Sequence, residues 1–179
     1  ELRCARWQEI DLERATWIVP GERDRARGLV GMKMKEDHLV PLSKRAVEVF
    51  EELHAYSGDG DLVFPNRNDP RRPISDGTVN SALRAMGYST AEACGHGFRA
   101  TAASALAEMG FRREVIDSQL SHRERSAVLG AYVHMAEYAE ERRRMMQHWA
   151  DYVDNLEHGR NVVLMKNKTV ARRRAADAA

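Results

Sequence analysis

The stretch from His96 to Tyr132 constrains the fold most strongly, because its apolar residues return with the 3.6-residue period of an α-helix. The stripe ends at Gly110, a typical helix stop. A chain with this pattern is expected to consist mainly of packed helices. The first helix is predicted to place five side chains on one stripe that faces a core: Phe98, Ala102, Ala105, Leu106 and Met109.

The same period continues beyond Gly110 and predicts a second helix that leads to His122. Ser121 and Glu124 have the spacing of a capping box, which predicts the start of a third helix that carries Tyr132. The inward residues predicted for the second helix are Val115, Ile116, Gln119 and Leu120.

Polar side chains stand at specific positions along these helices. His96 and Arg99 are three residues apart, so they are neighbours on the helix surface, off the apolar stripe. Taken singly, such a pair is typical of a solvated surface, and a lone tyrosine is typical of a core or surface residue. The joint order His96, Arg99, His122 after Leu-Ser, and Tyr132 is far more specific. These residue types suit phosphoryl transfer to a tyrosine.

This order resembles the catalytic half of the tyrosine recombinases, or phage integrases, most nearly the prophage and genomic-island integrases. The resemblance extends to about Leu156 and implies a mainly α (α+β) fold, a helical catalytic domain with a small three-stranded antiparallel sheet. We expect this domain to span residues 1–157. Residues 158–179 are expected to form a tail that is disordered or docks on a neighbouring protomer.

The start of the chain resembles the end of the family's first box, Arg-x-x-Glu-Leu, in Glu1-Leu2 and the following Trp7. The catalytic arginine of that box would stand three positions before Glu1, outside the sequence. Arg3 and Arg6 lie downstream and do not match it. The expectation is an N-terminally truncated catalytic domain that is inactive as given, because the first catalytic arginine is absent.

Alternating or β-rich runs predict a small antiparallel sheet, with the charged segment 22–27 as an exposed loop. From the residues alone, Lys33 and Lys35 are typical of the wet face of an edge hairpin. The resemblance implies instead a catalytic lysine in this hairpin, for which Lys33 is the first candidate and Lys35 the alternative. The predicted strands are Thr16–Val19, Met32–Lys35 and Leu39–Leu42.

Further helices are predicted after Ser43 and Ser75, which are natural N-caps, and over residues 138–156. The helix after Ser75 is expected to face inward with Val79, Leu83 and Met86. The last helix is expected to bury a stripe of Met145, Trp149, Tyr152 and Leu156 and to leave Arg142, Arg143 and Arg144 largely outside it.

The resemblance implies a role for each site residue. Tyr132 attacks the phosphodiester and keeps the 3′-phosphate, while Arg99 and His122 contact its non-bridging oxygens. His96 hydrogen-bonds a phosphate oxygen or takes the tyrosine proton. Lys33 protonates the leaving 5′-oxygen as general acid. No cofactor is expected. A metal is not expected either, because the sequence has no His-Glu-x-x-His pattern and no Cys-x-x-Cys pair.

The charge balance does not by itself indicate binding to nucleic acid, because the sequence has 28 Lys and Arg residues and 27 Asp and Glu residues. Any DNA-binding face must come from local segregation of charge. The polar loop with Arg67, Arg71 and Arg72, together with Lys35, is the predicted set of phosphate contacts. The partners implied are double-stranded DNA attachment sites and accessory DNA-bending proteins. The protein itself is expected to be monomeric in isolation and to form a homotetramer on DNA.

The function implied is site-specific recombination that integrates or excises a mobile element through a 3′-phosphotyrosyl intermediate. The alternatives are a DNA-binding fragment that does not cleave and a topoisomerase-like nicking-closing enzyme. Tyr138 is the rival nucleophile, at a different distance from His122. No run reaches the roughly 18 apolar residues of a membrane span. A cytoplasmic, nucleoid-associated location is therefore expected.

Overall fold

The computed structural model describes residues 1–24, 29–32, 35–121 and 138–160. The chain divides into two compact units, Glu1–Gly95 and His96–Ala179, and each is described by itself. Within the described ranges, no helix combines the length and the apolar character that crossing a membrane requires.

The first unit contains a three-stranded antiparallel sheet of order β1-β2-β3. Its strands are β1 (Ile10–Asp11), β2 (Thr16–Val19) and β3 (His38–Pro41), and two short 3₁₀ helices precede them, Leu2–Cys4 and Trp7–Glu9. Along β2, Trp17 and Val19 are buried and Ile18 between them is exposed, the alternation expected of a sheet with one covered face.

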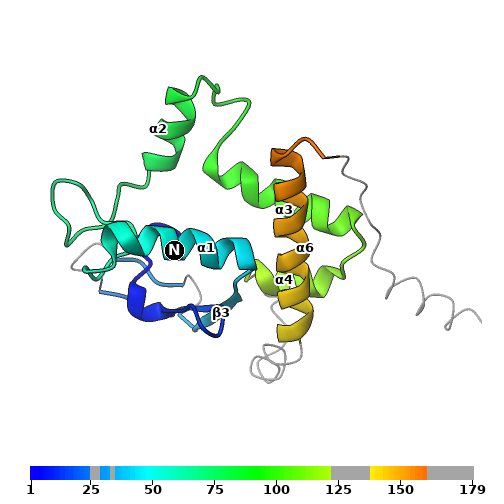
Figure 1. The fold of residues 1–179 in the computed structure, drawn as a ribbon, viewed down its shortest axis with the longest axis horizontal. Helices are drawn as coiled ribbons and strands as arrows, with labels where there is room; N and C mark the ends of the chain where they lie inside the picture. The colour runs from blue at the N-terminus through cyan, green and yellow to red at the C-terminus, as the bar shows by residue number, and fades with distance from the viewer. Residues whose placement is uncertain (25–28, 33–34, 122–137, 161–179) are drawn as a thin grey trace, which may run out of the picture. The chain divides into compact units, whose positions relative to one another are not determined.

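Helix α1 (Lys44–Ser57) lies in the same unit as this sheet and shares its core (Figure 1). The Ser43 hydroxyl accepts a hydrogen bond from the Ala46 amide at 3.2 Å, so the predicted N-cap is confirmed. The Trp7 indole donates to the Ser57 carbonyl at 2.9 Å and ties the end of α1 to the start of the chain. The buried residues of this core are Ala5, Trp17, Val19, Met32, Leu42, Phe50 and Val63.

The prediction of a strand over Met32–Lys35 is wrong for its described residues. The Lys35 amide donates to the Met32 carbonyl at 3.1 Å, and Lys35 has φ +56, so neither Met32 nor Lys35 belongs to a strand. The third strand of the sheet is β1, paired with β2 through Ile10 and Trp17. Period-two alternation could not exclude a turn, because only four residues support it.

Helix α2 (Thr78–Ala85) begins later than predicted. Gly77 is its N-cap, and the Ser75 hydroxyl lies 2.9 Å from the Thr78 hydroxyl instead of capping the helix. Leu83 is buried, but Val79 and Met86 are exposed, so two of the three predicted inward residues are wrong. An eight-residue helix that buries only one side chain turns little of its surface toward a core.

The described part of the second unit is helical. It contains α3 (Gly95–Glu108, whose first residue closes the first unit), α4 (Arg113–Gln119) and α6 (Ala139–Glu157) (Figure 1). Gly110 has φ +84, a conformation that favours glycine, and it ends α3 as predicted. The three helices pack around one cluster of buried residues, which confirms most of the predicted inward positions: Leu106, Met109, Val115, Ile116 and Met145.

Three predictions about these helices are wrong. Phe98 and Leu156, near opposite ends of their helices, are 55% and 54% exposed, because the buried cluster ends before it reaches them. Arg142 was expected largely outside the buried stripe of α6, yet its exposure is 0%. Position 142 is three residues before Met145, so helical spacing brings both onto one face.

Two contacts join α4 to the first turn of α6. Arg142 Nε donates to Gln119 Oε1 at 3.0 Å, and burial lowers the pKa of the Arg142 guanidinium to about 10. At the other end of α4, Arg112 Nη2 lies 2.6 Å from Glu141 Oε2. Both ends of the short helix are thereby fixed to the same part of α6.

Replacing Arg142 tests this attachment. Arg142→Ala removes the buried aliphatic stem and leaves Gln119 without this donor, so the free energy of unfolding should fall by about 3 kcal/mol. Arg143→Ala is the matched control. Arg143 pairs with Glu140 at 3.9 Å with its side chain 41% exposed, so its loss should cost less than about 0.5 kcal/mol. Urea unfolding of both variants measures the difference, and equal losses would contradict this account of α4 and α6.

Candidate active site

The first turns of α3 present two of the predicted catalytic residues. Gly95 opens the helix, and its amide donates to Asn80 Oδ1 at 2.9 Å. His96 is exposed and Arg99 is half-buried, three positions apart along the helix. They are therefore neighbours on one surface of α3, as the sequence predicts.

The guanidinium of Arg99 is held by the end of α4. Its Nη2 donates to the Leu120 carbonyl, the C-cap residue of α4. Carbonyls in the last turn of a helix have no partner within the helix, so they accept well from an arginine. This hydrogen bond uses one of the five N–H donors of Arg99. It fixes the guanidinium to a backbone position two residues before His122.

Tyr132, His122 and Lys33 lie outside the described residues, so the structure tests none of these three assignments. Ser121 has φ +53, which is not the extended conformation typical of an N-cap. Glu124, its partner in the predicted capping box, also lies outside the described residues. Of the catalytic set, the described residues include only His96 and Arg99.

Tyr138, the rival nucleophile, is half-buried and packs against the cluster of the second unit. The guanidinium carbon of Arg112 lies 5.1 Å from the centre of its ring, within cation–π range. The Arg112–Glu141 pair stands beside this contact, and its hydrogen bond raises the pKa of Arg112. These contacts give Tyr138 a packing role at the start of α6.

The structure describes the chain up to Met32 and again from Lys35, on either side of the candidate Lys33. Met32 is buried in the core of the first unit, and its amide donates to the Pro20 carbonyl at 3.0 Å. Lys35 is exposed, with Nζ 3.7 Å from Glu22 Oε1. Lys35 is therefore accessible to a phosphate, which is consistent with its predicted contact to DNA.

The arginine loop of residues 66–72 is closed by a bridge between Pro65 and Pro73. Arg67, Arg71 and Arg72 are all exposed, as the predicted phosphate contacts must be. Asp69 lies among them, 3.2 Å from Arg71 Nε and 3.8 Å from Arg72 Nε. The hydrogen bond from the Arg71 side chain is the main cause that lowers the pKa of Asp69.

The sequence did not predict the ion pair between the buried side chains of Glu9 and Arg23. Arg23 belongs to the segment predicted as an exposed loop, yet its side chain is 2% exposed and that of Glu9 is 7% exposed. Arg23 Nε and Nη2 reach the two carboxylate oxygens of Glu9 at 2.9 and 2.5 Å. No sequence pattern relates two charged residues this far apart, so only the fold reveals the pair.

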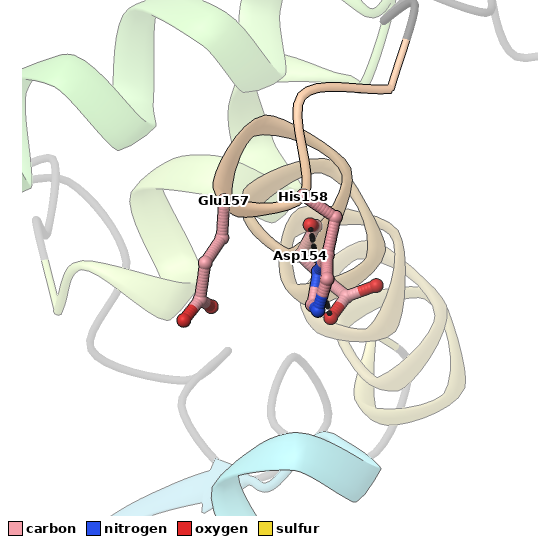
Figure 2. A group of neighbouring side chains, drawn as sticks. All are labelled: Asp154, Glu157 and His158. Carbon is pink, nitrogen blue, oxygen red and sulfur yellow. Dashed lines mark hydrogen bonds and ion pairs between the residues drawn. The ribbon is translucent and has the colours of Figure 1, made fainter.

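Among the described residues, one group has the residue types and spacing of a metal site: Asp154, Glu157 and His158, with ligand atoms within 4.8 Å of one another. Figure 2 shows a hydrogen bond between His158 and Asp154, in which Nδ1 of His158 lies 2.8 Å from the Asp154 carbonyl oxygen. The Asp154 carboxylate also pairs with Arg160 at 3.3 Å. Glu157 and His158 are exposed. These contacts suit a helix C-terminus, where a histidine interacts favourably with the last carbonyls.

The family model described as "Phage integrase family" matches residues 1–138. The chain is 50% identical to the integrase of Enterobacteria phage P4 over 160 residues, which are 86% of this chain and 36% of that protein. It is 48% identical to the putative protein IntB of Escherichia coli K12 over 160 residues, 86% of this chain and 40% of the relative.

A third relative, the prophage integrase IntA of Escherichia coli K12, is 38% identical over 164 residues, 92% of this chain and 37% of its own length. The chain thus spans about two fifths of these relatives. No solved structure matches it. Because the family model matches residues 1–138, which are most of the chain, the chain belongs to the phage integrase family.

Proposed function

We propose that this chain is the catalytic domain of a site-specific recombinase, which cuts and rejoins double-stranded DNA through a 3′-phosphotyrosyl intermediate. The observation that supports the proposal best is the anchoring of Arg99 to the Leu120 carbonyl. It holds a phosphate-binding guanidinium beside the backbone that leads to His122 and Tyr132. Arg99, His122 and Tyr132 all fall within residues 1–138, the range that the family model matches.

The cleavage step can be written with the residues of this chain. The Tyr132 oxygen forms a bond to phosphorus, and the bond from phosphorus to the 5′-oxygen breaks. The tyrosine proton leaves to a base, for which His96 is the candidate, and the Lys33 ammonium gives a proton to the departing 5′-oxygen. Arg99 and His122 donate to the non-bridging oxygens as charge develops.

Rejoining is the same step in reverse. A 5′-hydroxyl attacks the phosphotyrosine, the bond to the Tyr132 oxygen breaks, and the phosphodiester is restored. The bond energy stays in the phosphotyrosyl link, so the reaction needs no nucleotide cofactor. Cationic side chains supply the charge that a metal ion supplies in other phosphoryl-transfer enzymes.

The proposed partners are two double-stranded attachment sites and further copies of the protein, which form a homotetramer on DNA and are monomeric without it. Accessory DNA-bending proteins and a cytoplasmic, nucleoid-associated location belong to the same proposal. Arg67, Arg71, Arg72 and Lys35 are the proposed phosphate contacts, and all four are exposed. Residues 158–179 are proposed to dock on a neighbouring protomer. Most of them, including the apolar patch 162–165, lie outside the described residues.

The nucleophile is tested in the full-length protein that contains this chain. With a nicked duplex that traps the intermediate, Tyr132→Phe should abolish the covalent adduct, because the attacking oxygen is gone, and should leave DNA binding unchanged. Tyr138→Phe is the matched control and should retain the adduct. A denaturing gel with labelled DNA detects the product. If Tyr138→Phe abolished the adduct instead, Tyr132 would not be the nucleophile. If both variants retained the adduct, attack by a tyrosine at either position would be rejected.

A polypeptide limited to residues 1–179 gives a second test. Without the arginine expected three positions before Glu1, one of two guanidinium groups would be missing from the transition state. Loss of one preorganised donor costs on the order of 100- to 1000-fold in rate. This polypeptide should therefore bind duplex DNA weakly and form no detectable adduct, whereas the full-length protein should form one. An adduct from residues 1–179 would show that Arg99, His96 and His122 suffice. DNA binding by a full-length protein that never cleaves would favour a non-cleaving DNA-binding protein.

A further inference from the structure

Side chains of α2 contact the backbone one residue before His96, the candidate that binds phosphate or takes the tyrosine proton. We propose that Asn80 is a positioning residue for His96, because it holds the first amide of α3. The inference rests on the proposed function, since it gives Asn80 a part in the cleavage of DNA through the histidine.

The first turn of α3 has little tendency of its own to be helical. His96 stands between Gly95 and Gly97, and glycine is less favourable in a helix than any residue except proline. The first amides of a helix also lack partners within it. His96 is exposed, so burial does not hold its side chain in place. This turn therefore depends on contacts from outside the helix.

Two side chains of α2 supply such contacts. Asn80 Oδ1 accepts a hydrogen bond from the Gly95 amide at 2.9 Å and so satisfies one of the donors that the helix itself leaves without a partner. Arg84 stands four residues later, on the same surface of α2, and its Nη2 donates to the Ala93 carbonyl. The helix thus holds both ends of the short segment that leads directly to His96.

The backbone at Gly95 also lies close against α2. A Cβ added there would be 3.3 Å from Val79 Cγ1 and 3.7 Å from Asn80 Oδ1, so any side chain would press on α2. These contacts all lie within the first unit, which ends at Gly95. His96 is the next residue, so no residue between the two can absorb a displacement.

Arg99 is held in a different way, by the hydrogen bond from its Nη2 to the Leu120 carbonyl. Loss of the Asn80 contact should therefore act mainly on His96, in the terminal turn, since the ends of helices fray first. A base or a hydrogen-bond donor works only within reach of its partner. Each opening of the turn carries His96 out of that reach, so the reaction slows as the turn spends more time open.

The experiment measures the rate of adduct formation by the full-length protein, on the nicked trapping duplex at saturating DNA. Asn80→Ala should slow it about 5- to 30-fold, the factor by which loss of a side-chain cap shifts the opening of a helix end. Asn80→Asp keeps an acceptor oxygen, so its rate should stay within about threefold of the unmutated protein. Ser81→Ala, at an exposed neighbouring position on α2, is the matched control and should change the rate less than about twofold.

Two further comparisons separate positioning from other roles of Asn80. If Asn80 contacted DNA, the negative charge of Asn80→Asp would weaken DNA binding more than Asn80→Ala does. If Asn80 only stabilised the fold, Asn80→Ala would slow the reaction by the same factor with or without His96. A positioning role predicts instead that adding Asn80→Ala to His96→Ala slows the residual rate by less than about twofold.

Amide hydrogen exchange gives a readout that needs no catalysis. In Asn80→Ala, exchange should become faster over residues 93–99, which include the turn that Asn80 holds. It should stay unchanged over residues 103–109, which include the buried Leu106 and Met109.

Unchanged exchange over residues 93–99, a slower rate for Asn80→Asp than for Asn80→Ala, or an equal slowing with and without His96 would overturn the inference. The opposite results would support it. If the unmutated protein formed no adduct at all, the proposed function would fail and this inference with it. A normal adduct from the unmutated protein together with any of those three outcomes would reject the inference alone.

Discussion

The buried pair of Glu9 and Arg23 is the interaction on which the first unit depends most. Removing two charges from water costs several kcal/mol per ion, and that cost is offset only where hydrogen bonds satisfy both groups. Here the guanidinium reaches a carboxylate and two carbonyls, and the carboxylate also receives the Trp17 indole. The same contacts that make the pair tolerable connect the chain start, the sheet and the segment before the lysine.

In the second unit a different arginine, Arg142, combines burial with a hydrogen bond between elements. Arg142 is fully buried on α6 and donates to Gln119, the last residue of α4. The next residue, Leu120, offers its carbonyl to Arg99. Its low exposure makes Arg142 unsuited to bind DNA, and its position makes it a support for the end of α4. In each unit a buried guanidinium thus joins separate segments through hydrogen bonds.

The sequence predicts this fold well where periodicity carries the information. The stripe through Leu106 and Met109 and the N-cap at Ser43 follow from local rules and are confirmed. The inward positions of Phe98 and Met86 are wrong, because periodicity fixes a face but not how far along that face the core extends. The buried arginines could not be predicted from residue type, since arginine is almost never fully buried unless it is paired. Arg142 alone left a signal, its helical spacing from Met145.

These pairings also change how the charge of the chain relates to DNA binding. Arg142 is fully buried and the Arg23 side chain is only 2% exposed, so neither guanidinium adds charge to the surface, although both count among the 28 basic residues. In the arginine loop, Asp69 lies beside Arg71 and Arg72, so an approaching phosphate meets a competing carboxylate. The hydrogen bond from the Arg71 side chain lowers the pKa of Asp69. Each phosphate neutralised changes the salt slope of binding by about 0.9. Because Asp69 already neutralises part of this charge, the loop's three arginines should release fewer counterions than three isolated cations.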